Sequence, residues 1–309
     1  MTMIDPTKSA EEIELGGRLA MLSGVDAVGV EHRVSKLATR SLKKDTKRRA
    51  IDMAISMVDL TSLEGIDTRA RIREMCVKAV RPGGTASSVA AVCVYPDMVE
   101  VAKVSLEGSG VKVASVATGF PSGRVSQDAK LADVKEALTA GADEVDMVID
   151  RGALLSGNIV KVYDEVRLIK EACGAKVLKV ILETGELGSY DMIKRASWIA
   201  MLAGADFIKT STGKVAVNAT RGAALVMCEA ARDFAEEYGR MVGVKVAGGI
   251  KSSKEALSYL VIANETVGGA WLNPDMFRFG ASTLLNDLLA QRDKQLKGVY
   301  QRPENYSLG

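Results

Sequence analysis

From residue 51 onward, short apolar runs alternate with longer segments in which apolar residues recur at helical spacing. Short continuous apolar runs are typical of strands that are buried on both faces, and the amphipathic segments between them are typical of helices. We expect eight strands, over residues 55–60, 89–95, 111–117, 144–149, 177–182, 207–210, 244–247 and 277–279. The alternation predicts repeated βα units and a parallel sheet.

The intervals between these runs carry the helical patterns, which cover residues 128–140, 159–172, 190–203, 219–238 and 254–262. Several begin at an Asp, Ser, Thr or Asn, and three are followed by the glycines Gly141, Gly174 and Gly204, as expected at the two ends of helices. Eight such units over roughly 250 residues predict an α/β fold, a (β/α)8 TIM barrel. A doubly wound sheet is the alternative, but no G-x-G-x-x-G follows the first strand.

Residues 1–50 differ from the rest of the chain and end in a basic run at 40–49. We expect a helical N-terminal extension over 1–50, the (β/α)8 barrel over 51–292 and a C-terminal tail over 293–309. The basic run contains no aromatic residue, so a solvated helix face is favoured there over a nucleic-acid-binding patch.

Composition and net charge exclude several classes of protein. The chain has 309 residues, 47% of them hydrophobic, which is enough for a large buried core. Lysine and arginine total 41 against 39 for aspartate and glutamate, so no global field favours nucleic acid or an anionic membrane. Four scattered cysteines form no CxxC pair, and neither a signal-peptide pattern nor an 18-residue apolar run is present. We therefore expect a soluble protein with reduced thiols in the cytoplasm.

Charged residues interrupt four of the predicted strands, at Asp146, Lys179, Lys209 and Lys245. Strand side chains alternate between faces, so turning these four inward places their aliphatic neighbours outward against the helices. An isolated buried charge costs several kcal/mol. We therefore expect the four to converge inside the barrel, either as internal salt bridges or as a catalytic group.

Lys209 and Lys245 lie on neighbouring predicted strands, roughly 5 Å apart at matched height. A second ammonium group and partial burial both lower the pKa of a lysine and free its amine to attack a carbonyl. One of the two would then be the nucleophile and the other would lower its pKa. Asp146 could move protons while an imine forms and a carbon–carbon bond breaks.

Metal-dependent chemistry can be weighed by elimination. A zinc aldolase or hydrolase ordinarily needs two or three histidines, and this sequence contains one, His32, in the N-terminal extension. We assign His32 an ordinary surface role. The same scarcity disfavours a Ser-His-Asp triad, so we expect lysine chemistry with no metal and no organic cofactor.

Glycines gather after the last three predicted strands and suggest a phosphate site. In TIM barrels the loops after strands seven and eight commonly bind phosphate through backbone N–H groups. The candidate residues are Gly213, Lys214, Gly248, Gly249, Gly280, Ser282 and Thr283. Gly213–Lys214 does not continue as a P-loop, because Val215 stands where the magnesium-binding Ser or Thr is required.

Seven segments together resemble the deoxyribose-phosphate aldolase family, in family order. They cover residues 58–63, 92–96, 141–146, 178–187, 206–220, 244–249 and 278–282. The resemblance implies a class I aldolase that reversibly cleaves 2-deoxy-D-ribose 5-phosphate to acetaldehyde and D-glyceraldehyde 3-phosphate in deoxyribose phosphate catabolism. It also implies a lysine Schiff base, no cofactor and, by family habit, a homodimer.

The resemblance also implies roles for single residues. Lys209 matches the Schiff-base lysine, Lys245 the lysine that lowers its pKa, and Asp146 the proton-relay aspartate. The phosphate site matches Gly213, Lys214, Gly248, Gly249, Gly280 and Ser282, and the substrate pocket matches Asp59, Thr61 and Lys179. Cys93 matches a cysteine near the site, where a plain core thiol is the favoured role.

One residue departs from the family pattern: Val246 stands where proline usually follows the second lysine, which restores a backbone N–H. Two other functions are compatible with a barrel that has a phosphate rim. The first is an isomerase or a different lysine aldolase that uses Asp146 or Lys179 as its acid–base group. The second is a catalytically silent sugar-phosphate-binding protein, which the paired lysines disfavour.

Overall fold

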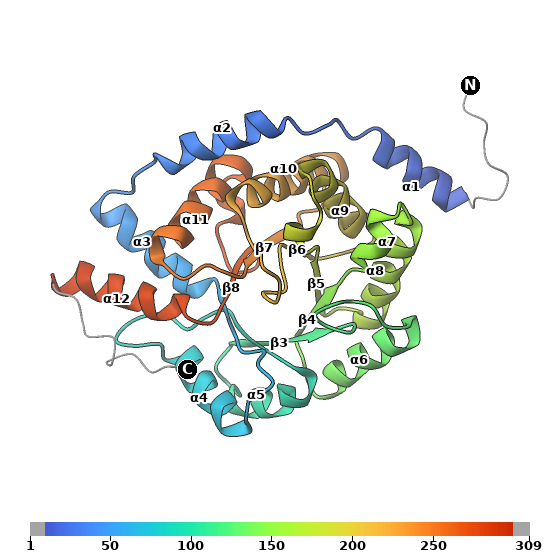
Figure 1. Ribbon diagram of the computed structural model, residues 1–309. Helices are drawn as coiled ribbons and strands as arrows, with labels where there is room; N and C mark the ends of the chain where they lie inside the picture. The colour runs from blue at the N-terminus through green and yellow to red at the C-terminus, as the bar shows by residue number, and fades with distance from the viewer. Residues whose placement is uncertain (1–9, 299–309) are drawn as a thin grey trace.

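Eight parallel strands close into a barrel in the computed structural model, which describes residues 10–298. Each strand pairs with the next along the chain, and the last pairs with the first. The ring of helices around the strands is seen in Figure 1. The strands are β1 (Val58–Thr61), β2 (Ala91–Val94), β3 (Lys112–Ala117), β4 (Glu144–Val148), β5 (Val177–Ile181), β6 (Phe207–Lys209), β7 (Gly243–Ala247) and β8 (Phe277–Ala281). The predicted TIM barrel is confirmed.

The helices of the barrel occupy the predicted intervals. They are α4 (Arg69–Val80), α5 (Val99–Ser105), α6 (Gln127–Thr139), α7 (Arg151–Leu155), α8 (Ile159–Cys173), α9 (Tyr190–Leu202), α10 (Arg221–Tyr238), α11 (Ser253–Val267) and α12 (Leu284–Lys297), with short 3-10 turns at Pro96–Met98, Thr184–Glu186 and Gly269–Trp271. The N-caps of α9, α10 and α11 are Ser189, Thr220 and Ser252, and each side chain accepts a hydrogen bond from the backbone N–H three residues on. These caps satisfy helix donors that would otherwise lack partners.

The first strand begins later than predicted. We expected it from residue 55, whereas Ile55 and Ser56 complete the helix α3 (Lys44–Ser56) and β1 starts at Val58. Ile51, Ala54 and Ile55 are all buried on one face of α3, so the apolar run that suggested a strand belongs partly to a helix.

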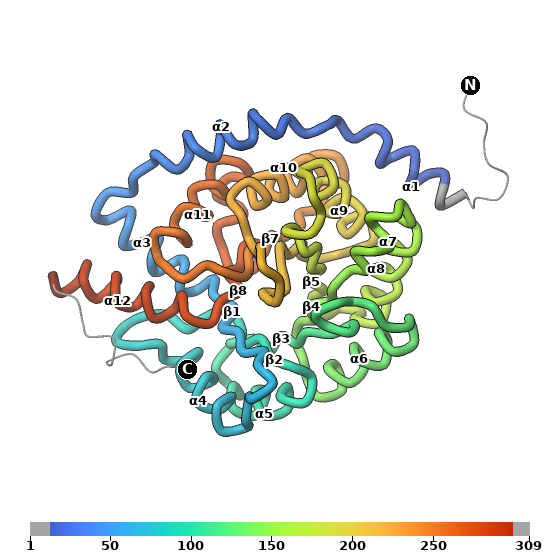
Figure 2. Tube along the Cα trace, in the orientation of Figure 1, coloured from blue at the N-terminus to red at the C-terminus, as the bar shows by residue number. Residues whose placement is uncertain are grey.

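The N-terminal extension lies across the outside of the barrel. Its helices α1 (Ala10–Ala20) and α2 (Ala27–Ala38) arch over α9, α10 and α11, as Figures 1 and 2 both show. Val30 and Val34 of α2 are buried in the main hydrophobic core. The extension is therefore packed onto the barrel.

The ends of the predicted regions fall inside helices. Residue 50 lies within α3, and α12 continues past residue 292 to Lys297. Residues 1–9 and 299–309 lie outside the described part of the chain, and these include most of the predicted C-terminal tail.

His32 is exposed on α2, and the basic run at 40–49 is largely exposed. Within residues 10–298 no helix combines the length and apolarity needed to span a membrane.

The strands alternate faces as predicted. Val145, Met147, Val180, Ile208, Val244 and Val246 are buried in the hydrophobic core between strands and helices. The intervening residues point inward, where a separate small apolar cluster contains Leu63, Cys93, Ala114 and Val116. The barrel interior is therefore apolar at β2 and β3, which leaves the other strands for the charges.

Candidate active site

The four charges predicted inside the strands meet in the structure. Asp146 is adjacent to Lys179 in the strand register, and Lys209 is adjacent to Lys245. The Nζ atom of Lys179 lies 2.8 Å from Oδ1 of Asp146, and those of Lys209 and Lys245 lie 2.7 and 2.8 Å from Oδ2. All four side chains are buried. The predicted convergence is confirmed, with Asp146 at its centre.

A second group of charges lies next to Asp146 and was not identified from the sequence beyond Asp59. Asp59 accepts hydrogen bonds from Lys245 at 2.6 Å and from Arg278 at 2.5 Å. Glu144 pairs with Arg278 at 3.0 Å and with Lys179 at 2.5 Å. Glu144 precedes Asp146 by two residues, and Arg278 is adjacent to Lys245 in the register, so strand alternation could have placed both inside the barrel.

This buried cluster contains one more cation than it has carboxylates. Its four cations are Lys179, Lys209, Lys245 and Arg278, and its three carboxylates are Asp59, Glu144 and Asp146. Loss of one proton from a lysine makes the cluster neutral, and a neutral cluster costs less to bury than a charged one. The cluster therefore favours one uncharged amine.

Lys209 is the lysine that the surroundings favour as the amine. Burial lowers the pKa of Lys209, and the charge of Lys245 lowers it further against the opposing effect of Asp146. Burial also acts against the charge of Lys245, but Asp146 and Asp59 outweigh it and raise the pKa of Lys245 well above its ordinary value. The strand pattern alone left open which lysine is the nucleophile, whereas the family resemblance implied Lys209; the opposite directions of the two pKa shifts favour Lys209 as the neutral amine.

Asp146 is held as a carboxylate. Burial alone would raise its pKa, but Lys179, Lys209 and Lys245 together hold the pKa of Asp146 well below its ordinary value. Asp146 is already hydrogen bonded to the Nζ atom of Lys209. It is therefore placed to accept a proton from that nitrogen and to return it.

A cavity of about 170 Å3 opens above the cluster at the carboxyl ends of the strands. Its lining includes Thr61, Lys209, Gly213, Lys214, Gly248, Gly249, Gly280 and Ser282. Every predicted phosphate residue thus borders one cavity. Among the described residues, Lys209 is the one member of the charged cluster that lines it. The other cluster charges lie beneath.

Of the four remaining predicted site residues, one lines the cavity and three do not. Thr61 lines the cavity, and its hydroxyl donates to the backbone carbonyl of Asp59. Asp59, Lys179 and Cys93 do not line the cavity; the first two belong to the charged cluster, and Cys93 packs in the small apolar cluster. Burial raises the pKa of the Cys93 thiol, which is typical of a core thiol.

Gly280 makes room for this arrangement. A Cβ atom at that position would lie 2.8 Å from the Cβ of Ala247 and 3.0 Å from the Cε of Lys245. Neither distance is compatible with an unshifted side chain. Gly280 therefore both exposes backbone to the cavity and leaves space for the Lys245 side chain below it.

Two lysines provide positive charge at the cavity rim. The Nζ atom of Lys214 lies 2.9 Å from Oε1 of Glu64, which also lines the cavity. Lys251 also lines the cavity and is exposed. Lys214 was a candidate from the sequence and Lys251 was not, although Lys251 lies two residues after Gly249. An anion in the cavity would lie near both lysines.

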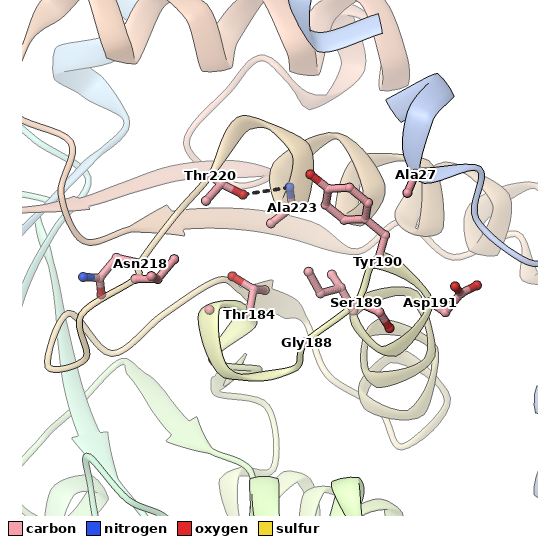
Figure 3. A pocket seen from close by; sticks show the side chains of 12 residues that line it. Ala27, Thr184, Gly188, Ser189, Tyr190, Asp191, Asn218, Thr220 and Ala223 are labelled. Carbon is pink, nitrogen blue, oxygen red and sulfur yellow. Dashed lines mark hydrogen bonds between the residues drawn. The ribbon is translucent and has the colours of Figure 1, made fainter. Parts of the chain in front are cut away.

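A larger cavity of about 400 Å3 lies outside the barrel and lacks this chemistry. It is bounded by the N-terminal ends of α9 and α10 and by Ala27 of α2, as Figure 3 shows. Its described lining includes Thr184, Tyr190, Asn218 and Thr220 but no lysine. We therefore assign the candidate active site to the smaller cavity above Lys209.

Comparison with known proteins identifies the family of the chain. The profile of the DeoC/LacD family aldolases matches residues 49–290, which is most of the chain. The chain belongs to this family. The deoxyribose-phosphate aldolase of Mus musculus is 43% identical over 298 residues, which cover 90% of this chain and 94% of that protein.

Solved structures of similar proteins share the barrel. A Toxoplasma gondii protein, provisionally described as a deoxyribose-phosphate aldolase, is 26% identical and superimposes with a TM-score of 0.70 over 84% of this chain and 100% of its own. The Aeropyrum pernix deoxyribose-phosphate aldolase, described as a tetramer, is 25% identical with a TM-score of 0.61 over 84% of this chain and 100% of its own.

Proposed function

We propose that this aldolase cleaves 2-deoxy-D-ribose 5-phosphate reversibly to acetaldehyde and D-glyceraldehyde 3-phosphate through a Schiff base on Lys209. The observation that carries the proposal is the position of Lys209, whose amine joins the buried charged cluster to a glycine-lined cavity. A sugar phosphate bound with its phosphate at the glycine rim can direct its aldehyde toward that amine.

Covalent chemistry would begin with attack of the neutral Lys209 amine on C1 of the open-chain sugar. Asp146, hydrogen bonded to the same nitrogen, accepts the proton that the nitrogen loses and passes it to the carbonyl oxygen to give the carbinolamine. One further proton from solvent lets the carbinolamine hydroxyl leave as water, and the iminium ion forms. Lys245 stays protonated, and its charge keeps Asp146 ionised before each transfer.

Carbon–carbon cleavage would follow from the iminium ion. Asp146, directly or through a water, takes the proton from the C3 hydroxyl as the C2–C3 bond breaks, and the electron pair of that bond passes to the iminium nitrogen to leave an enamine. D-glyceraldehyde 3-phosphate departs, C2 of the enamine takes up a proton, and water hydrolyses the iminium to release acetaldehyde. The phosphate stays at the rim, which Gly213, Lys214, Gly248, Gly249, Gly280 and Ser282 would form.

Borohydride trapping tests this proposal directly. Incubation with acetaldehyde and reductant should add a stable two-carbon group to the peptide that contains Lys209, and Lys209→Ala should abolish both the adduct and cleavage. Lys214→Ala is the matched control, because it removes a rim lysine but leaves the amine. An adduct on another lysine would exclude the assigned nucleophile. Cleavage without any adduct would exclude the Schiff base.

The homodimer and the cytoplasmic location stay predictions of the sequence. Light scattering on the purified chain would measure the first. A tetramer, as described for the Aeropyrum pernix relative, would contradict it.

A further inference from the structure

Glu183 is a buried carboxylate in an unusual backbone conformation directly after β5. Its φ and ψ angles are 57° and 59°, in the left-handed region that residues other than glycine seldom adopt. Its relative exposure is 0%. Strained residues of this kind persist where the surrounding structure holds them, and they cluster at functional sites.

The conformation of Glu183 inserts one extra residue beside β6. The N–H of Leu182 donates to the carbonyl of Lys209, and the N–H of Thr184 donates to the carbonyl of Thr210, each at 2.9 Å. Between these two hydrogen bonds the chain advances by two residues on the side of β5, from Leu182 to Thr184, and by one residue on the side of β6, from Lys209 to Thr210. The extra residue on the side of β5 is a bulge at the rim of the barrel. A bulge changes the direction in which a side chain points, and this one directs Glu183 toward the loop that follows Lys209.

Glu183 holds that loop through Thr212. Its carboxylate accepts hydrogen bonds from the backbone N–H of Thr212 at 3.2 and 3.3 Å and from the Thr212 hydroxyl at 2.5 Å. The Thr212 hydroxyl oxygen in turn accepts from the backbone N–H of Lys214 at 3.1 Å. The chain of bonds thus runs from Glu183 through Thr212 to Lys214, across Gly213.

The carboxylate is not used for charge pairing. Glu183 has no ion pair with any residue in the range 10–298, unlike the three carboxylates below Lys209. The next residue, Thr184, lines the outer cavity between α9 and α10 in Figure 3. In the described part of the chain, the side-chain hydrogen bonds of Glu183 all come from Thr212, in the loop of residues 210–214 after β6 that we call the phosphate-rim loop.

We infer that Glu183 is a positioning residue that fixes Thr212, Gly213 and Lys214 for recognition of the substrate phosphate. The inference deepens the proposed function and rests on it for the identity of the phosphate ester. Glu183 does not border the cavity and acts through Thr212. Its contribution therefore belongs to phosphate binding and not to the bond-breaking steps at Lys209.

Kinetics with two substrates separate these contributions. For Glu183→Gln we expect KM for 2-deoxy-D-ribose 5-phosphate to rise about tenfold, which corresponds to about 1.4 kcal/mol, with kcat nearly unchanged. The kcat/KM for unphosphorylated 2-deoxy-D-ribose should stay at the wild-type value. Glu183→Ala, which keeps the same backbone strain but removes both acceptors, should raise the phosphate-dependent KM further. Equal losses with both substrates would overturn the inference.

Glu186→Gln is the matched control. Glu186 lies three residues further on, its side chain is 45% exposed, and it pairs with Arg151 outside the phosphate-rim loop. We expect wild-type KM values from this variant. An increase equal to that of Glu183→Gln would show that general loss of a carboxylate in this segment, and not the bond to Thr212, causes the effect.

Amide hydrogen exchange tests the same inference without any turnover. Peptides covering 210–215 should exchange faster in Glu183→Gln and faster still in Glu183→Ala, while peptides from the strands keep wild-type rates. Unchanged exchange at 210–215 in both variants would overturn the positioning role. If the wild-type chain fails to cleave deoxyribose phosphate, the proposed function fails, and the exchange result still decides whether Glu183 holds the loop.

Discussion

Replacing Lys245 with methionine removes one positive charge from beside Lys209 and keeps a side chain of similar length. In the wild type both Nζ atoms bond to Oδ2 of Asp146, at 2.7 and 2.8 Å, so the two nitrogens lie within about 5.5 Å of each other. The substitution also leaves Asp146 with one cation fewer. Both changes stabilise the protonated form of Lys209, so we expect the pKa of Lys209 to rise.

The size of the effect follows from the separation of the two charges. Two unit charges about 5 Å apart interact with about 3 kcal/mol at an effective dielectric constant of about 20. A loss of that size lowers the fraction of neutral amine at neutral pH by a factor on the order of 100. We therefore expect kcat/KM of Lys245→Met near pH 7 to fall by a factor on the order of 100 while the fold remains intact.

A pH profile distinguishes this electrostatic effect on the pKa of Lys209 from a structural disruption of the site. In the proposed mechanism neutral Lys209 is the reactive form, so activity should rise as pH rises through the pKa of Lys209. The acidic limb of kcat/KM, recorded from about pH 6 to about pH 10, should move to higher pH in Lys245→Met, with activity partly recovered at the alkaline end. The rate of borohydride trapping should follow the same shift.

Lys179→Met is the charge-matched control. It removes a cation from the same cluster, but Lys179 bonds to the other oxygen of Asp146 and lies beside Glu144. We expect a smaller displacement of the acidic limb. Equal displacement in the two variants would show that total cluster charge matters and proximity to Lys209 does not. A wild-type rate and profile in Lys245→Met would refute our account of amine activation.

Three further expectations concern the rim, the glycine beneath it and the acid stability of the cluster. Lys214→Ala should raise KM for the phosphorylated substrate about tenfold with a small effect on kcat, measured in the coupled cleavage assay. Gly280→Ala should lower both stability, by about 1–3 kcal/mol in denaturant titrations, and kcat, because the added Cβ displaces Lys245. The pKa of Asp146 is depressed, so its contribution to stability is present above the unfolded value near pH 4 and is lost as pH falls through the folded pKa. Asp146→Asn should therefore weaken the acid dependence of the unfolding free energy, and an unchanged dependence would contradict this.

Periodicity made the barrel predictable from the sequence. The apolar runs and the helical segments follow different periods, and the caps and glycines that separate them act locally, so no tertiary information was needed. The start of β1 was wrong because Ile55 is apolar in either element, and the neighbours that bury it in α3 are decided by packing. Boundaries of this kind depend on contacts that a local pattern does not contain.

The site residues that could be predicted from the sequence are those that interrupt the apolar pattern of a strand. Asp146, Lys179, Lys209 and Lys245 were conspicuous because charges are costly inside strands. The sequence predicted Lys209 and Lys245 at matched height, and the strand register pairs them. The sequence did not predict that Lys209, and not Lys245, lines the cavity, nor that Arg278 meets Asp59 from a strand that is distant in sequence, because both depend on how the strands close into the barrel. Glu183 was missed because its left-handed backbone gives no signal in residue type.

The surplus cation in the buried cluster has a consequence for the covalent intermediates of the proposed mechanism. An iminium ion on Lys209 carries the same charge as the ammonium group that it replaces, whereas the amine and the enamine are both neutral. The reaction therefore moves between two charge totals that the surrounding carboxylates and cations already accommodate. No counter-ion has to enter or leave the buried cluster during these changes, because the same carboxylates and cations suit both the resting protein and the proposed intermediates.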